Sequence, residues 1–100
     1  MRLTPGQQAA IRIAAIEAFG AGAAVWLFGS RADDGKRGGD IDLLVRPDQD
    51  AADGLFDRKI RMLKKLESLL GERKVDLVVE EPHDTRPIVA IAHTTGVQIK

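Results

Sequence analysis

The chain has 100 residues, which is enough for one domain and too few for two. Its 15 basic and 15 acidic side chains cancel, so we expect no direct binding to DNA and no attraction to anionic lipid. It has no cysteine, no run of about 20 apolar residues and no secretory leader, which predicts a cytoplasmic protein without disulfides, thiolate metal sites or membrane spans.

The first predicted element is a helix over residues 6–19. Thr4 suits a helix N-cap, Pro5 suits the first helical position, and Gly20 and Gly22 follow where the helix should end. Apolar side chains cover nearly its whole circumference, whereas a surface helix normally keeps one polar face. We therefore expect this helix either to be unusually buried or to be covered in part by another chain, which leaves a homo-oligomer open.

Short apolar runs predict three strands, at residues 23–28, 41–45 and 75–79. Between the second and third strands, apolar residues at helical spacing predict an amphipathic helix over residues 55–70. Gly71 stands where the C-terminal cap of that helix belongs.

The chain after Pro82 predicts a loop, a short helix over residues 87–93 and an edge strand over residues 97–99. A further short helix is expected after Ser30. The order is thus helix, strand, short helix, strand, helix, strand and C-terminal tail. This order predicts an α/β (α+β) fold with one small sheet, in a single domain over residues 1–100.

Gly29 and Ser30 follow the first predicted strand and indicate a nucleotide-binding turn. Glycine lets backbone N–H groups approach a phosphate closely, and serine suits the N-cap of a short helix whose N-terminus favours an anion. Arg31, Lys36 and Arg37 come next in the same loop and can contact the outer phosphates. Taken alone, a Gly-Ser pair usually marks only a turn.

Asp40 and Asp42 are the first candidates for metal ligands. They are two residues apart at the start of a strand, so both side chains leave the same face with Cα atoms roughly 7 Å apart. Ile41, Leu43 and Val45 then point the other way, into the core. Two carboxylates on the open face of a sheet can share one or two hard cations, and the pattern suits Mg²⁺ held together with nucleotide phosphates.

Asp76 is the candidate for a third carboxylate. If strand 75–79 lies beside strand 41–45 in register, Asp76 joins Asp40 and Asp42 on one face. It can then accept the proton of an attacking hydroxyl or act as a further metal ligand. Taken alone, Asp40 and Asp42 could be solvated residues at a strand start, and Asp76, preceded by Lys74, could equally be an exposed charge or a catalytic group. The joint pattern of glycine, serine and three strand-borne carboxylates favours nucleotidyl transfer.

These motifs, at residues 28–31, 39–45 and 75–78, resemble those of the minimal nucleotidyltransferases of the DNA polymerase beta superfamily. The resemblance covers essentially the whole chain. It implies a palm-like mixed sheet, with helices on one face and the nucleotide bound on the other.

The resemblance also implies a role for each motif residue. Gly29 and Ser30 correspond to the turn that grips the nucleotide, and we include Arg31 with them. Asp40 and Asp42 correspond to the metal ligands. Asp76 corresponds to the third carboxylate, and it is a candidate both for a metal ligand and for the base. The implied cofactor is Mg²⁺ and the implied substrate is ATP.

Such small proteins are often encoded beside a HEPN-domain partner. In characterised pairs the partner is an RNA-cleaving toxin, and the nucleotidyltransferase is an antitoxin that transfers AMP from ATP to one of its tyrosines. This chain departs from many relatives in having nine residues, not ten, between Ser30 and Asp40, and Gly39 where they have serine. We expect the acceptor site to come from a partner or another copy.

Two other functions are alternatives to nucleotidyl transfer. A non-catalytic antitoxin or binding module would neutralise its partner by covering it, which the apolar first helix favours. An aspartate-based phosphotransferase also uses an Asp-x-Asp pair, but there the pair follows an apolar strand, whereas here it begins one. His83 and His93 are interpreted as structural or exposed, and Trp26 as a core residue.

Overall fold

A computed structural model describes residues 3–29 and 40–100. The predicted order of elements is confirmed in these residues, with the addition of a 3₁₀ helix that was not predicted. The elements are α1 (Pro5–Phe19), β1 (Ala24–Phe28), β2 (Ile41–Arg46), the 3₁₀ helix η2 (Gln49–Ala51), α2 (Leu55–Leu70), β3 (Val75–Val79), α3 (Pro87–Thr95) and β4 (Val97–Gln98). The short helix expected after Ser30 falls outside the described residues.

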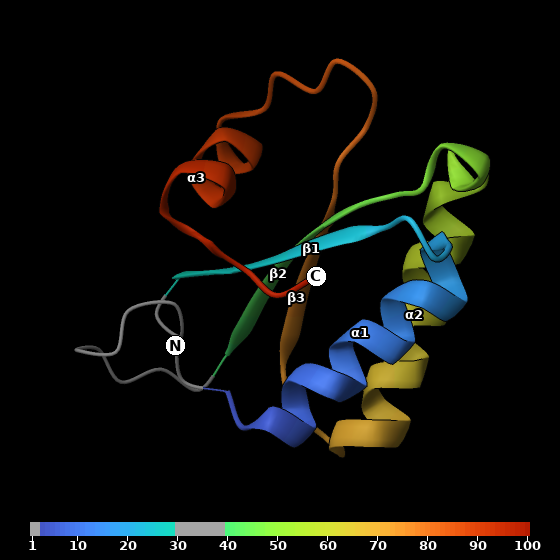
Figure 1. Ribbon diagram of the computed structural model, residues 1–100, viewed down its shortest axis with the longest axis vertical. Helices are drawn as coiled ribbons and strands as arrows, with labels where there is room; N and C mark the ends of the chain where they lie inside the picture. The colour runs from blue at the N-terminus through green and yellow to red at the C-terminus, as the bar shows by residue number, and fades with distance from the viewer. Residues whose placement is uncertain (1–2, 30–39) are drawn as a thin grey trace.

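The four strands form one mixed sheet in the order β3-β2-β1-β4 (Figure 1). β1 pairs antiparallel with both β2 and β4, and β2 pairs parallel with β3. The parallel pair is possible because α2 carries the chain back along the sheet between β2 and β3. β4 lies at one edge of the sheet, as predicted.

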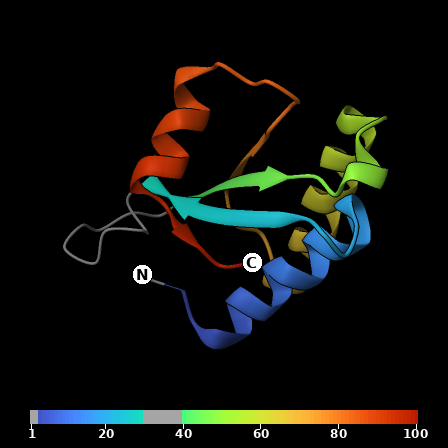
Figure 2. The same cartoon turned by 45° about the horizontal axis from the view of Figure 1, so that its top comes forward.

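Helices pack on both faces of the sheet (Figure 2). α1 and α2 lie together on one face, over a core that includes Leu27, Leu43 and Phe19. α3 lies on the other face, because its Val89 and Ala92 pack against buried side chains of β1 and β2. The expectation of helices on one face therefore holds for the two long helices and not for α3.

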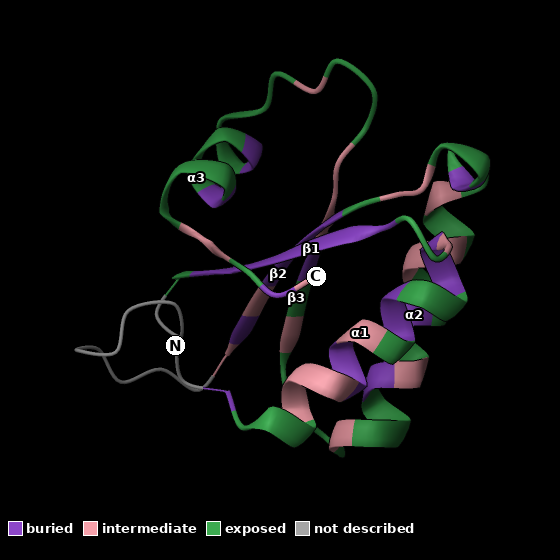
Figure 3. Cartoon of the chain, viewed as in Figure 1, coloured by how far each residue is buried: buried purple, intermediate pink, exposed green. Residues whose placement is uncertain are grey.

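α1 begins and is buried largely as its sequence predicts. The Oγ1 atom of Thr4 accepts a hydrogen bond from the Gln7 N–H at 3.1 Å, and Gln7 Oε1 accepts one from the Thr4 N–H at 2.9 Å. This capping box fixes the first turn. Six residues of the helix are buried against the rest of the chain (Figure 3). Ile13 and Ile16 stay 47% and 43% exposed, so one apolar strip of α1 is not covered.

Asp48 ties the end of α1 to the turn before β1. Its Oδ2 atom accepts a hydrogen bond from the Gly22 N–H at 2.8 Å. A Cβ atom on Gly20 would lie 2.8 Å from the Cβ of Asp48, which is too close for any other residue type without a shift. These glycines therefore end the helix and also make room for Asp48.

None of the helices in the described part of the chain is long and apolar enough to cross a membrane.

A turn between β3 and α3 is built around Asp84. Its carboxylate accepts hydrogen bonds from the Glu81 N–H at 3.0 Å and from the Arg86 guanidinium, the shorter at 2.6 Å. The same guanidinium donates to the Val79 carbonyl at 2.6 Å, so the turn is joined to the end of β3. The Asp84 side chain is only 3% exposed. Hydrogen bonds from Arg86 and from backbone amides hold the pKa of Asp84 well below its usual range.

Replacing Asp84 with asparagine should therefore lower stability in a pH-dependent way. A carboxyl whose folded-state pKa lies below its unfolded value of about 3.9 stabilises the fold above that pH. Its contribution is lost as the pH falls through the folded-state pKa. Chemical unfolding should show D84N less stable than wild type at pH 7, with the difference shrinking below about pH 4. Asp53→Asn, at a side chain that is 91% exposed, is the control and should change little. A pH-independent difference for D84N would contradict this account.

Candidate active site

The parallel register of β2 and β3 brings two of the predicted carboxylates together. Asp42 and Asp76 are direct partners across the two strands. Ile41 and Leu43, on either side of Asp42, are fully buried in the core beneath α1 and α2. Because side chains alternate along a strand, Asp42 and Asp76 lie on the opposite face, where Asp42 is half-buried and Asp76 exposed. Strand 75–79 thus lies beside strand 41–45 in register, as the proposed role of Asp76 requires.

Asp40 lies one step further along the same face and contacts a lysine. The Ile41 N–H donates to the Lys74 carbonyl at 3.1 Å, which aligns the beginnings of the two strands. The Lys74 Nζ atom then lies 3.6 Å from Asp40 Oδ2. Both side chains keep solvent contact, with 69% of Lys74 and 47% of Asp40 exposed. Asp40 is thus paired with a cation at the margin of the carboxylate cluster.

The electrostatics of the cluster centre on Asp42. Partial burial raises the pKa of Asp42, and so do the charge of Asp76, a hydrogen bond with its side chain and the charge of Asp40. Lys74 acts in the opposite direction. Asp42 therefore lies between two further carboxylates, an arrangement of like charges that favours a bound cation.

Only glycine fits at position 29, because the backbone there lies against the Asp42 carboxylate. Its φ is +74°, in the left-handed region that favours glycine. A Cβ atom at this position would lie 3.2 Å from Cγ of Asp42 and closer still to its Oδ2. The turn after β1 therefore comes directly against the Asp42 carboxylate. Ser30 and Arg31, the other predicted nucleotide-binding residues, lie outside the described residues, as do Lys36 and Arg37.

The fit of these residues to Mg²⁺ follows from their chemistry. Asp42 and Asp76 offer hard oxygen ligands side by side, and Mg²⁺ is usually held by one or two carboxylates together with substrate phosphates. Within residues 3–29 and 40–100, no three acidic or histidine side chains converge closely enough to hold one metal ion. Asp40, the other expected ligand, is paired with Lys74. The facing pair of Asp42 and Asp76 thus suits Mg²⁺.

A comparison with protein families agrees with this geometry. Residues 14–100 match the family described as Polymerase beta, Nucleotidyltransferase. The chain belongs to this family. The matched region contains β1, β2 and β3, and therefore the whole carboxylate cluster and Gly29. A search of curated protein sequences finds no significant match. The family assignment supports transferase activity for this chain.

Within this nucleotidyltransferase, Trp26 and His93 belong to a separate cluster. Trp26 is 8% exposed, as expected for a core residue. His93 meets the Trp26 ring edge-on, with ring centroids 4.4 Å apart, and its Nε2 lies 2.6 Å from Glu80 Oε1. Arg46 lies over the same indole at 5.2 Å. These contacts join α3 to the sheet at the end of β2 opposite Asp42, which agrees with a structural role for His93.

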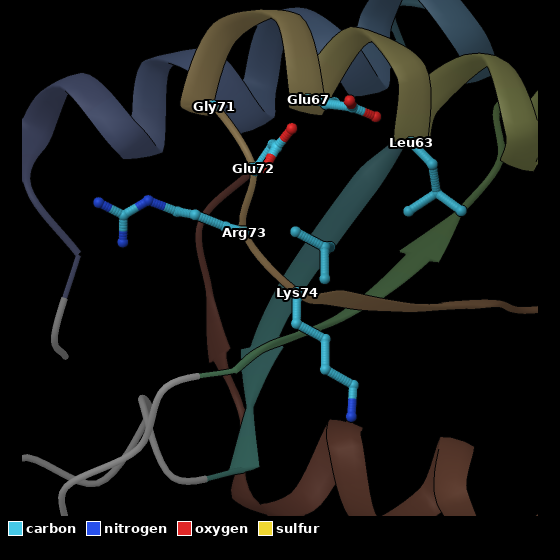
Figure 4. Close-up of a pocket in the computed structure, with 7 residues that line it drawn as sticks. Leu63, Glu67, Gly71, Glu72, Arg73 and Lys74 are labelled. Carbon is cyan, nitrogen blue, oxygen red and sulfur yellow. The ribbon is translucent and has the colours of Figure 1, made fainter.

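Lys74 is the site residue whose role the sequence did not predict. In the sequence, Lys74 indicates only that Asp76 could be an exposed surface charge. Its position two residues before Asp76 was the available signal, because residues i and i+2 of a strand share a face. Lys74 also lines a shallow pocket of about 480 Å³ between α2 and the start of β3. Figure 4 shows its side chain extending away from Glu67 and Glu72.

Replacing Gly29 with alanine should damage the site more than the fold. The left-handed backbone would cost about 1–2 kcal/mol in stability for any L-residue. The new methyl group would also displace Asp42, and a shift of that kind in a reacting group can cost about 100-fold in rate. Gly71→Ala is the matched control, because Gly71 also has a positive φ, +80°, with open space around its Cβ position. We expect similar unfolding curves for both variants and a loss of nucleotidyl transfer only for G29A. Equal transfer by the two would refute the contact.

Proposed function

We propose that the protein is a Mg²⁺-dependent nucleotidyltransferase that transfers AMP from ATP to a hydroxyl of a partner protein. The single observation that carries this proposal is the pairing of Asp42 with Asp76 across β2 and β3, directly beside Gly29. The resemblance to minimal nucleotidyltransferases further suggests a tyrosine acceptor on a HEPN-domain toxin. The protein would then act as an antitoxin in the cytoplasm, where ATP is present.

Each residue of the site would have a separate role in this reaction. Asp42 and Asp76, with Asp40, would hold Mg²⁺, which supplies charge neutralisation for the triphosphate. The exposed Asp76 is the carboxylate best placed to accept the proton of the acceptor hydroxyl. The hydroxyl oxygen then forms a bond to the α-phosphorus, and the bond from that phosphorus to pyrophosphate breaks. Gly29 would let the backbone approach the phosphates closely.

Labelled ATP tests the proposal directly. When the wild-type protein is incubated with labelled ATP, Mg²⁺ and the protein encoded beside it, that neighbouring protein should become labelled. Asp42→Asn should lower labelling at least about 100-fold, because it removes a charged ligand from the centre of the site. Asp57→Asn, an exposed carboxylate in the first turn of α2, is the control for charge and should label normally. A folded but unlabelled neighbouring protein would argue against the proposed acceptor.

A masking antitoxin is the second candidate, and the exposed strip of α1 favours it. Ile13 and Ile16 are three residues apart, so they lie on one side of the helix, and both are exposed. Single exposed apolar residues are common on protein surfaces. A neighbouring pair on a helix that is apolar around nearly its whole circumference offers a contact for another protein or a second copy.

Ile13→Glu tests docking through α1, and Asp42→Ala distinguishes masking from catalysis. If α1 docks onto a partner, this substitution should weaken binding about tenfold or more, as expected for a central apolar contact. Ile91→Glu makes the same change at a residue of α3 that is 50% exposed on the other face, and it should leave binding unchanged. Under masking, Asp42→Ala should still neutralise the partner, whereas under catalysis it should not. Binding of the partner can be measured by calorimetry.

A further inference from the structure

Four side chains at the beginnings of β2 and β3 form a square on one face of the sheet. Ile41 and Val75 are paired in the parallel register, so Asp40 and Lys74 precede that pair and Asp42 and Asp76 follow it. Because residues two apart on a strand share a face, all four side chains lie on the face away from α1 and α2. Three corners are carboxylates, and the fourth is an ammonium group.

Lys74 has a backbone held by the sheet and a side chain that is largely exposed to solvent. The Lys74 carbonyl accepts the Ile41 N–H at 3.1 Å, so the residue cannot move along the strand without breaking the sheet. Its side chain, in contrast, is 69% exposed and reaches Asp40 Oδ2 at 3.6 Å. A flexible four-carbon stem with a compact charge can take and leave such a position easily.

The lysine also accounts for the arrangement of the acids. Three carboxylates on neighbouring positions repel one another, and a single positive charge among them lowers that repulsion. Asp40 is drawn towards Lys74, and no three acidic side chains of the described residues converge on one point. The pair is solvent-exposed, so its attraction is weak enough for a divalent cation to overcome.

We propose that Lys74 is a tethered counter-ion of the acidic site, which holds Asp40 until a divalent cation takes its place. This inference rests on the proposed function, since the cation concerned is the one that nucleotidyl transfer would use. It assigns Lys74 a positioning role: the lysine sets how tightly the site binds its metal and where Asp40 rests without one.

Metal binding without nucleotide or acceptor is the decisive measurement. Mn²⁺ can replace Mg²⁺ as a probe, with the free ion counted by electron paramagnetic resonance. Lys74→Met should tighten Mn²⁺ binding about two- to fivefold, the range expected on removing one exposed ion pair that competes with the metal. Lys74→Arg keeps the charge and should bind as wild type does. Lys64→Met, an exposed lysine on α2 on the other side of the sheet, controls for net charge and should also bind as wild type does.

A second background tests whether the effect passes through Asp40. If the lysine acts by holding that carboxylate, Lys74→Met should have no further effect on Mn²⁺ affinity when Asp40→Asn is already present. Thermal unfolding without metal should show K74M less stable than wild type, and added Mn²⁺ should remove this difference.

Several results would overturn the inference. These are an unchanged or weaker Mn²⁺ affinity in K74M, an equal gain in the Asp40→Asn background, or a loss of stability that Mn²⁺ does not restore. A wild-type protein that binds Mn²⁺ and shows the predicted K74M effect but labels no acceptor would contradict the proposed function alone. If neither wild type nor K74M binds Mn²⁺, both proposals fail.

Discussion

The parallel pairing of β2 with β3 is the constraint on which the rest of the structure depends. It places Asp42 beside Asp76 and aligns Asp40 with Lys74. It also sends Ile41 and the other odd-numbered residues of β2 into the core beneath α1 and α2. Side chains alternate along a strand, so a slip of one residue would bury the carboxylates and expose the core. The same hydrophobic requirement therefore holds both the fold and the geometry of the site.

Much of the fold could be predicted from local sequence, because its signals are local. The bounds predicted for α2 and β3 agree with the structure at both ends. α3 continues to Thr95, beyond the predicted residue 93, because its cap comes later: the Gly96 N–H donates to the Ala92 carbonyl at 2.9 Å. The face that α3 covers could not be predicted, since its apolar residues would suit either side of the sheet until Trp26 and its neighbours are in place.

The candidate site was predictable in its members and less so in its contacts. Alternation of apolar and acidic residues was enough to put Asp40 and Asp42 on one face. The position of Asp76 beside Asp42 depends on a pairing between strands more than 30 residues apart in the sequence. No local pattern fixes such a pairing. The ion pair of Lys74 with Asp40 depends on that pairing too, and an isolated lysine beside an aspartate resembles ordinary surface charge.

The antiparallel register of β1 with β2 has a consequence for how the motif can vary among relatives. Phe28 and Asp42 are direct partners in the sheet, so both ends of the connection between these strands are held by backbone pairing. A residue gained or lost inside that connection leaves the pairing, and hence Gly29 against Asp42, unchanged. The nine-residue spacing between Ser30 and Asp40 is therefore compatible with an intact carboxylate cluster. Insertions and deletions in this family should be tolerated there and not between Asp40 and Asp42, where one residue would reverse a side chain.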